Sequence, residues 1–289
     1  MTLSLKWNPQ GAPRKPEIVG IGAQKAGTSW LSHMLGQHSG VWGTPLKEVH
    51  FFNHRFIAAH RYWISWHYRQ KPVEIRARFQ RRAEVLPAVM DDYLRSICAG
   101  AQMYSNHWYK QVFAPAPEGT KPMEVTPEYS ALPAEGVDFV ARFLPRARFI
   151  YLVRDPVDRA VSQLRMTLLR ERRRPDSPAA WAGEIATPVL AERGDYATYI
   201  PRWQARLGDR LLVLPYGDIA RDPLALMRRI EGFLDLPPAD YADLGLRVFA
   251  TPDGIAVPDP ARAALRERLA GQYDYLRDAF GEDFLAATA

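Results

Sequence analysis

A pair of glycines with a lysine between them is the first group of residues with recognisable chemistry. In GIGAQKAGTSWL (20–31), Gly22 and Gly27 lie five residues apart and Thr28 follows. An ATP-type phosphate loop would place lysine at position 28, whereas here the lysine is Lys25, in the middle of the loop. The pattern therefore favours a single 5′-phosphate that carries a transferable group near Lys25. A plain glycine turn between a strand and a helix is the alternative.

A second group lies in YLVRDPVDRAVSQ (151–163). Arg154 offers a planar fork for a phosphate, and Ser162, two helical turns later, adds a hydroxyl. Together they would hold a second phosphate of the same nucleotide. In the competing interpretation Arg154 pairs with Asp155 or Asp158, and Ser162 is a surface residue.

Apolar runs that alternate with helical patterns position both groups. We expect strands over 16–23, 41–44, 122–127, 147–154 and 210–216, and helices over 28–38, 156–172, 178–193, 195–207, 223–234 and 260–280. This alternation predicts an α/β fold with three layers, α/β/α, around a central, mainly parallel sheet. Ligands of such sheets bind at the carboxyl ends of strands, where both the glycine loop and Arg154 lie, so the two can share one ligand.

The composition limits the class of protein. The 289 residues are 47% hydrophobic and 24% charged, which suits a single domain (1–289) with an irregular arm over 1–16. The net charge of +6 fits an anionic ligand, but the basic cluster at 170–175 is too short to predict nucleic-acid binding. The single cysteine, Cys98, excludes an intrachain disulfide. No signal peptide or membrane-length apolar run occurs, so we expect a cytoplasmic protein without integral membrane association.

Taken together, the two phosphate motifs resemble those of the PAPS-dependent sulfotransferases, where PAPS is 3′-phosphoadenosine 5′-phosphosulfate. QKAGTSWL (24–31) is similar to the 5′-phosphosulfate loop of that family, and RDPVDRAVSQ (154–163) to its 3′-phosphate motif. The resemblance is closest to the branch of heparan sulfate N- and 3-O-sulfotransferases, and it spans roughly 16–285. Three further segments resemble the family in the expected order: KEVHFF (47–52), WYKQVF (108–113) and EVTPEY (124–129).

The resemblance implies a reaction and a set of site residues. PAPS would donate its sulfuryl group to an acceptor, most simply a hydroxyl, by in-line transfer without a metal. Lys25 would stabilise the bridging oxygen as the S–O bond breaks. Arg154 and Ser162 would bind the 3′-phosphate. The loop residues implied in donor binding are Gln24, Lys25, Ala26, Gly27, Thr28, Ser29 and Trp30.

The segment KEVHFF (47–52) would supply the base that deprotonates the acceptor. By resemblance the base is Glu48. In an extended segment Glu48 and His50 would point the same way, because side chains alternate along a strand. His50 is the alternative base, since imidazole is the commonest base at neutral pH, although it can equally be a structural histidine. Lys47 either helps to hold the sulfuryl group or the acceptor, or is simply exposed.

Two segments depart from the family pattern. Val125 stands where the family has a lysine before its Thr-Pro pair. In the late loop TPDGIAVPDP (251–260), which resembles a Lys-Gly-Arg nucleotide clamp, Gly254 remains but Asp253 and Ile255 replace the basic residues. Either this loop points elsewhere, or Arg247 or Arg262 substitutes for the clamp, or PAPS binding is weaker.

The acceptor is expected to bind beneath a helical insertion at about 53–106. Tyr62, Trp66 and Arg69 recur there at helical spacing and predict the packed face of a helix; sugar or anion binding is the alternative. A sugar, a lipid-linked sugar or a small metabolite is favoured over a secreted polymer. Two other functions stay open: a P-loop small-molecule kinase or NTPase, which Thr28 in the lysine position disfavours, and a non-catalytic nucleotide-binding protein.

Overall fold

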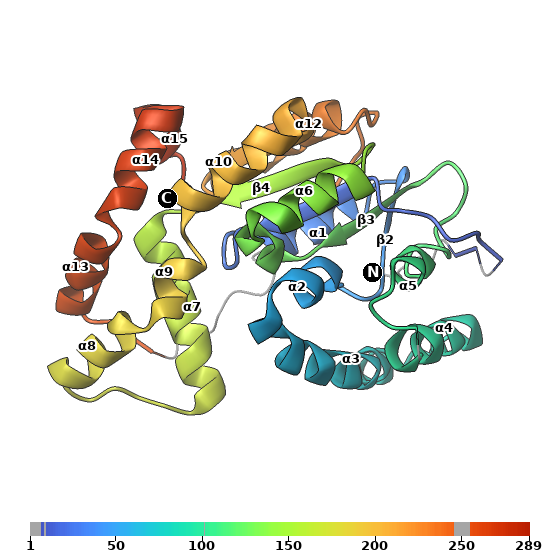
Figure 1. The fold of residues 1–289 in the computed structure, drawn as a ribbon, viewed down its shortest axis with the longest axis horizontal. Helices are drawn as coiled ribbons and strands as arrows, with labels where there is room; N and C mark the ends of the chain where they lie inside the picture. Colours follow the sequence, from blue (N-terminus) through green and yellow to red (C-terminus); the bar gives the residue numbers. More distant parts are fainter. Residues whose placement is uncertain (1–6, 9, 101, 246–254) are drawn as a thin grey trace.

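A parallel sheet of five strands forms the centre of the protein (Figure 1). The structure is a computed structural model that describes residues 7–8, 10–100, 102–245 and 255–289. The strands lie in the order β2-β3-β1-β4-β5, and every neighbouring pair is parallel. Their bounds are β1 (Ile18–Gly22), β2 (Val41–Gly43), β3 (Lys121–Val125), β4 (Arg148–Val153) and β5 (Leu211–Pro215).

The two central strands are apolar because helices cover the sheet on both faces. Every residue of β1 is buried, and so is every residue of β4 after Arg148. Helix α1 packs behind the sheet in Figure 1, whereas α6 and α10 pack against each other in front of it. The predicted three-layer α/β/α fold is thereby confirmed. The helices of these layers are α1 (Thr28–Leu35), α6 (Ala134–Phe143), α10 (Tyr196–Leu207) and α12 (Pro223–Phe233).

A second group of helices extends beyond the sheet on the side of α7 (Figure 1). It has its own apolar core, which includes Val161, Trp181 and Leu265. The helices expected over 178–193 and 260–280 are each broken in two. The first break falls at Thr187, because a residue before proline is driven out of the helical region. The helices are α7 (Pro156–Glu171), α8 (Pro178–Ala186), α9 (Pro188–Glu192), α13 (Asp259–Arg268), α14 (Ala270–Phe280) and α15 (Glu282–Ala286).

The segment expected as a helical insertion lies along the other flank of the sheet (Figure 1). It contains α2 (Phe51–Phe56), η1 (Ala58–His60), α3 (Arg61–Arg81) and α4 (Ala88–Ala99), and α5 (Asn106–Gln111) follows it. The remaining short helices are η2 (Pro127–Ala131), η3 (Gly208–Arg210) and α11 (Asp218–Arg221). None of the helices in the described ranges combines the length and the apolar character that a bilayer crossing requires.

The packed face of α3 differs from the one that the spacing predicted. Tyr62 is 88% exposed and Trp66 is 56% exposed, so the prediction that they pack the helix is wrong. The helix buries Ile64, Tyr68 and Ile75 instead. The Tyr68 hydroxyl donates to the carbonyl of Val49 at 2.6 Å, which fixes this face of α3 against the segment before α2.

The sheet has one point where the chain changes direction. From β1 the chain runs through α1 to β2 and β3 on one side, whereas from β4 it runs to β5 on the other. The crevice between the carboxyl ends of β1 and β4 is therefore the topological switch point, where ligands of doubly wound sheets bind. The glycine loop follows β1, and Arg154 follows β4.

Candidate active site

The loop between β1 and α1 is a tight turn that only glycine permits at its end. Gly27 has φ +89°, and a Cβ at this position would lie 2.6 Å from Ile219 and 3.1 Å from Tyr216. Lys25 also adopts a left-handed conformation, with φ 69°. Gly27 is the N-cap of α1 and supplies no side-chain cap, so the first turn of α1 is left for other partners. This end of the helix suits an anion.

Three cations surround this loop, and we call Lys25, Lys47 and Arg154 the cationic cluster. The Arg154 guanidinium donates to the carbonyl of Lys25 at 3.2 Å and lies 4.6 Å from the ring centre of Tyr216. The Lys47 ammonium donates to the Ser29 hydroxyl at 2.5 Å. Burial lowers the pKa of Lys25, and the charges of Arg154 and Lys47 lower it further. Such mutual repulsion is relieved by a bound anion.

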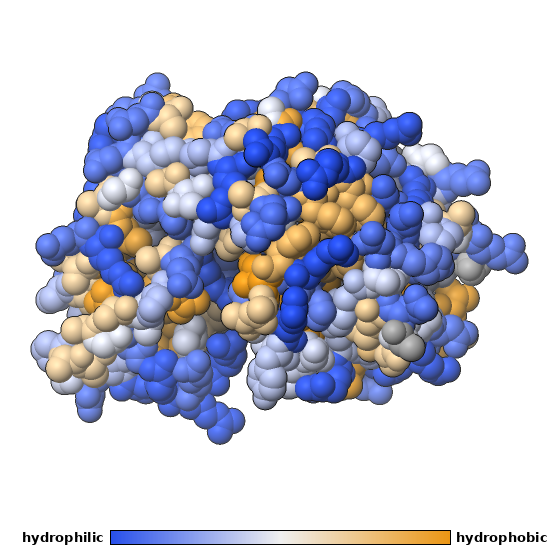
Figure 2. All heavy atoms as spheres, in the orientation of Figure 1, coloured by the Kyte–Doolittle hydropathy of each residue, from blue (hydrophilic) through white to orange (hydrophobic). Residues whose placement is uncertain are grey.

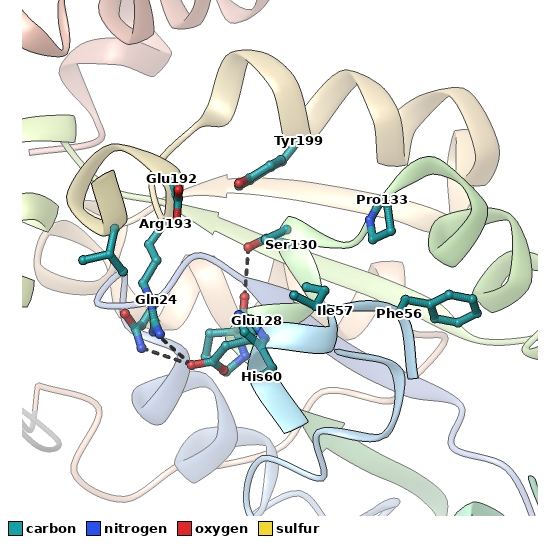
Figure 3. A pocket seen from close by; sticks show the side chains of 13 residues that line it. Gln24, Phe56, Ile57, His60, Glu128, Ser130, Pro133, Glu192, Arg193 and Tyr199 are labelled. Atoms are coloured by element: carbon teal, nitrogen blue, oxygen red, sulfur yellow. Dashed lines mark hydrogen bonds and ion pairs between the residues drawn. The ribbon is translucent and has the colours of Figure 1, made fainter. Parts of the chain in front are cut away.

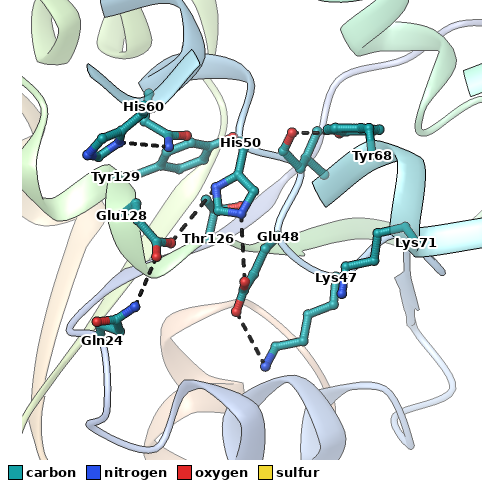
Figure 4. Close-up of polar contacts among 12 residues, drawn as sticks. Gln24, Lys47, Glu48, His50, His60, Tyr68, Lys71, Thr126, Glu128 and Tyr129 are labelled. Carbon is teal, nitrogen blue, oxygen red and sulfur yellow. Dashed lines mark hydrogen bonds and ion pairs between the residues drawn. The ribbon is translucent and has the colours of Figure 1, made fainter. Parts of the chain in front are cut away.

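A row of acidic and imidazole side chains lies next to the cationic cluster (Figure 4). Glu48 Oε2 is 3.7 Å from His50 Nε2, and His50 Nδ1 is 3.8 Å from Glu128 Oε2. Lys47 Nζ lies 3.6 Å from the other oxygen of Glu48 and links the row to the cations. Glu48, His50 and Glu128 form what we call the carboxylate–histidine row.

The backbone of this row is not the extended strand that sequence reasoning assumed. Glu48 has φ 67° and His50 has φ 55°, both in the left-handed region, so the argument from strand alternation is wrong. Glu48 and His50 nevertheless lie side by side. Their positions depend on tertiary bonds, since Tyr68 holds the Val49 carbonyl and the Tyr129 hydroxyl accepts from the Phe51 amide at 3.0 Å.

Charge keeps Glu48 ionised. Burial by itself would raise the pKa of Glu48, but the interactions with His50 and Lys47 outweigh it and bring the pKa to about 2. Two more imidazoles surround the row. Burial lowers the pKa of His67 to about 3 and that of His60 to about 4, with further contributions from neighbouring groups that include Lys71 and Arg193, so both are uncharged at neutral pH. The His67 ring stands edge-on to the His50 ring, with centres 4.8 Å apart.

Beneath the row, Glu124 is fully buried among hydroxyl groups. It accepts from Tyr109 and from Thr126, the latter at 2.9 Å, and from Tyr129 at 3.1 Å. Burial raises the pKa of Glu124 to about 7, although these hydrogen bonds oppose the shift. Since Tyr129 also accepts from the backbone at Phe51, this network fixes the floor of the site.

The row also has the donor atoms of a metal site. Glu48, His50 and Glu128 each bring a ligand atom to within 4.8 Å of the others, and this is the group found among the described residues. Its fit to a metal is poor, because the Lys47 ammonium lies 3.6 Å from Glu48 and would repel a second cation.

Comparison with known proteins places the chain in a family. The model of the sulfotransferase family matches residues 16–240. The chain belongs to the sulfotransferase family. The resemblance that the motifs QKAGTSWL (24–31) and RDPVDRAVSQ (154–163) predicted is confirmed.

The sulfotransferase relatives include enzymes of the heparan sulfate branch. Heparan sulfate glucosamine 3-O-sulfotransferase 3A1 from Mus musculus is 33% identical over 141 residues, and the 3B1 enzyme from Homo sapiens is 30% identical over 139 residues. Each match covers 45% of this chain but only 34% and 35% of the relative. The matched region thus spans about a third of the length of these curated relatives.

Solved sulfotransferases share the fold over nearly the whole chain. The sulfotransferase from Alicyclobacillus acidocaldarius has a TM-score of 0.65 at 21% identity and covers 95% of this chain and 99% of its own. The sulfotransferase domain of the Synechococcus PCC 7002 olefin synthase has a TM-score of 0.53 at 17% identity, with coverages of 91% and 98%. At these identities the likeness shows the fold alone.

The structure places the predicted loop residues in different roles. Lys25, Thr28 and Ser29 lie at the switch point beside Arg154. The Trp30 side chain, in contrast, packs in the core and donates to the Leu244 carbonyl at 3.0 Å. Ala26 is fully buried.

The Gln24 side chain turns away from the cationic cluster. Its amide nitrogen donates to Glu128 Oε1 at 3.1 Å. Arg193, from the end of α9, reaches the same oxygen at 3.1 Å (Figure 3). Sequence reasoning missed Glu128 and Arg193 as site residues, whereas His60 and His67 fall inside the segment 53–106 that was expected to cover the acceptor. Of these, Glu128 had a signal, because it lies inside the segment EVTPEY (124–129).

The positions around the second phosphate motif give a mixed result. Ser162 is half-buried on α7, eight residues beyond Arg154. The alternative pairing of Arg154 with Asp155 or Asp158 is not what the described contacts show: Asp158 accepts from Arg262 at 2.6 Å, and Asp155 caps α7. Arg262 is therefore already paired. Arg247 and Asp253 lie outside the described residues, as do positions 251–254 of the late loop (251–260), whereas Ile255 is described and is buried.

Val125, the other departure, is part of the sheet. It is buried at the end of β3, where it packs on Gly20; a Cβ at Gly20 would lie 2.8 Å from it. The side chain at this position is therefore core, and the cations of the site come from Lys25, Lys47 and Arg154 instead.

Proposed function

We propose that this protein transfers the sulfuryl group of PAPS to a hydroxyl of a sugar, glycolipid or small metabolite. The observation that carries the proposal is the cationic cluster at the switch point, next to an ionised carboxylate. The loop before α1 suits the 5′-phosphosulfate, and Arg154 with Ser162 suits the 3′-phosphate. Family membership supports sulfuryl transfer itself.

Lys25 and Glu48 act on opposite sides of the transferred sulfuryl group, Lys25 at the leaving oxygen and Glu48 at the acceptor oxygen. The acceptor oxygen forms a bond to sulfur while the bond from sulfur to the 5′-phosphate oxygen breaks. Lys25 stabilises the negative charge that develops on this leaving oxygen. Glu48 takes the proton of the acceptor hydroxyl. The adenosine 3′,5′-bisphosphate leaves with the electrons of the broken bond, so charge and atoms balance without a metal.

The low pKa of Glu48 makes it a weak base until the donor is bound. The contact between Lys47 and Glu48 contributes to this low pKa. An anionic phosphosulfate in the loop would attract the Lys47 ammonium, and its own negative charge would disfavour the carboxylate. Both effects raise the pKa of Glu48, so donor binding makes Glu48 a stronger base. His50, 3.7 Å away, is the alternative base and the next acceptor for the proton.

The decisive experiment is calorimetric titration with adenosine 3′,5′-bisphosphate, the expected product, beside ATP with Mg²⁺. The bisphosphate is expected to bind without metal, and ATP is expected to bind weakly, because Thr28 stands where a triphosphate loop has its lysine. Binding of Mg-ATP without binding of the bisphosphate would reject sulfuryl transfer in favour of a kinase or NTPase. Bisphosphate binding without transfer to any acceptor would favour a non-catalytic nucleotide-binding protein.

A further inference from the structure

A cavity of about 350 Å³ opens beside the carboxylate–histidine row. We call it the side cavity; α2 and η1 border it on one side and α9 and α10 on the other (Figure 3). Figure 2 shows the surface hollowed between α9 and α2, with apolar residues at the edge of the hollow. Its walls are apolar at Phe56, Ile57, Pro133, Val189 and Tyr199. This volume suits a small molecule or one end of a longer one.

The side cavity borders the residues of the proposed chemistry at Gln24 and Glu128, which both line it. Gln24 directly precedes Lys25 in the loop. Glu128 Oε2 is the atom that lies 3.8 Å from His50. A molecule in the side cavity would therefore lie next to both the phosphosulfate loop and the carboxylate–histidine row.

Two residues that line the side cavity, Gln24 and Glu128, each carry a buried acceptor atom without a hydrogen-bond partner. Glu128 Oε2 and Gln24 Oε1 are both buried and without a hydrogen-bond partner, although Oε1 of Glu128 is bonded twice. The Glu128 side chain is only 8% exposed. A buried acceptor without a donor is costly, so the site favours a ligand that supplies O–H or N–H groups.

The charge of the side cavity disfavours anions. Glu128 and Glu192 line it, and Arg193, the one cation among its described lining residues, is already paired with Glu128. His60 also lines the cavity, but its low pKa, about 4, leaves it uncharged at neutral pH. A sulfate or carboxylate placed here would therefore meet carboxylates without a free cation to bind it.

We propose that the side cavity is the acceptor pocket and that it selects an uncharged hydroxyl compound with an apolar face, such as an aryl or alkyl glycoside, over an anionic glycan. The inference rests on the proposed sulfuryl transfer and names its acceptor class. It also separates this protein from the matched relatives, whose names specify heparan sulfate, a polyanion. The apolar walls take the aryl or alkyl group, and the polar side chains of the lining, among them Gln24, Glu128 and Glu192, take the sugar hydroxyls.

Phenyl β-glucoside and phenyl β-glucuronide test this selection, because they differ only in a hydroxymethyl and a carboxylate group. Their binding is measured calorimetrically on the whole chain saturated with adenosine 3′,5′-bisphosphate, and their turnover is measured with radiolabelled PAPS. The glucoside is expected to bind at least about tenfold more tightly, since like charges at an interface are strongly unfavourable. Equal or tighter binding of the glucuronide would overturn the proposal, and so would the failure of both to bind.

Val189→Trp tests the location of the pocket. Val189 lies on α9, is 38% exposed and lines the side cavity, so a larger side chain fills the cavity without burying new polar groups. Glucoside affinity is expected to fall at least about tenfold, while bisphosphate affinity stays unchanged. Val73→Trp, at a position 58% exposed on α3, is the matched control and should change neither affinity.

The outcomes separate this inference from the proposed function. Unchanged glucoside binding in Val189→Trp would place the acceptor elsewhere and leave sulfuryl transfer intact. A wild-type protein that does not bind the bisphosphate would reject sulfuryl transfer itself. Glu192→Gln tests the charge argument, because it removes one carboxylate from the lining. The ratio of glucoside affinity to glucuronide affinity should decrease in this variant. An unchanged ratio would contradict the proposed role of Glu192.

Discussion

On one side of the candidate site, Lys25 and Arg154 follow two adjacent parallel strands, whereas on the other side His60, Trp63 and His67 come from η1 and α3. The strand side is positively charged and is set by the ends of β1 and β4. On the helical side, His60, Trp63 and His67 are uncharged at neutral pH, and their positions are set by packing between helices. Local sequence is therefore enough to predict which residues meet at the strand ends of a parallel sheet. Residues on the helical flank are positioned by contacts between segments that are distant in the sequence.

The largest effect should come from removing the lysine of the strand side. Lys25→Ala is expected to lower turnover about 10³-fold, because it deletes the charge opposite the leaving oxygen, while bisphosphate affinity changes much less. Single-turnover kinetics and calorimetry would measure the two quantities. Lys71→Ala, which removes a lysine paired with Glu74 on α3, is the control. Equal losses in binding and turnover would refute a role in the transition state.

The base at the border between the two sides should give the next largest effect. Glu48→Gln is expected to reduce turnover by about 10²-fold or more, with nucleotide affinity nearly unchanged, because the amide does not accept the proton. Glu74→Gln, at a side chain 54% exposed on α3, is the matched control. If Glu48→Gln retains activity, His50 becomes the base.

Arg154 tests whether the strand side binds the 3′-phosphate. Arg154→Ala should weaken the bisphosphate about 10- to 100-fold, since a hydrogen bond to a charged group contributes about 1.5–3 kcal/mol. The affinity for 5′-AMP, which lacks the 3′-phosphate, should change less. A parallel loss for both nucleotides would place the 3′-phosphate away from Arg154.

The helical side should control how stability depends on pH. The folded pKa values of His60 and His67, about 4 and about 3, lie below the ordinary histidine pKa of 6.5 because both rings are buried. Between pH 6.5 and 4 the unfolded chain binds more protons than the folded chain, so stability falls as the pH falls through this window. Urea unfolding at pH 7.5 and 5.0 would measure this change in the free energy of unfolding. In His67→Gln the free energy of unfolding should depend less steeply on pH. An unchanged pH dependence would exclude His67 as one of its causes.

The smallest expected effect is a difference in the free energy of unfolding between variants of two tryptophans on α3. Trp63 stands edge-on to His50, with ring centres 4.8 Å apart, whereas Trp66 is 56% exposed. Trp63→Ala should lower the free energy of unfolding by about 1 kcal/mol or more. Trp66→Ala should stay within about 0.5 kcal/mol. A larger loss for Trp66 would mean that the packed face of α3 is the one predicted from sequence.

The sequence by itself determined the sheet and the half of the candidate site that we propose binds the donor. The apolar runs predicted all five strands, because strands buried on both faces must be apolar along their whole length. Because ligands bind at the carboxyl ends of such strands, the sequence predicted that Lys25 and Arg154 lie together. In the structure the Arg154 guanidinium donates to the Lys25 carbonyl at 3.2 Å.

Tertiary structure alone decided the half that we propose binds the acceptor. Gln24 and Glu128 are 104 residues apart and Arg193 is 65 residues beyond Glu128, so no local pattern could pair them. The left-handed backbone at Glu48 and His50 runs against local preference and is held by Tyr68 and Tyr129. Local sequence can specify a strand and the turn that follows it, but contacts between helices depend on how the whole chain packs.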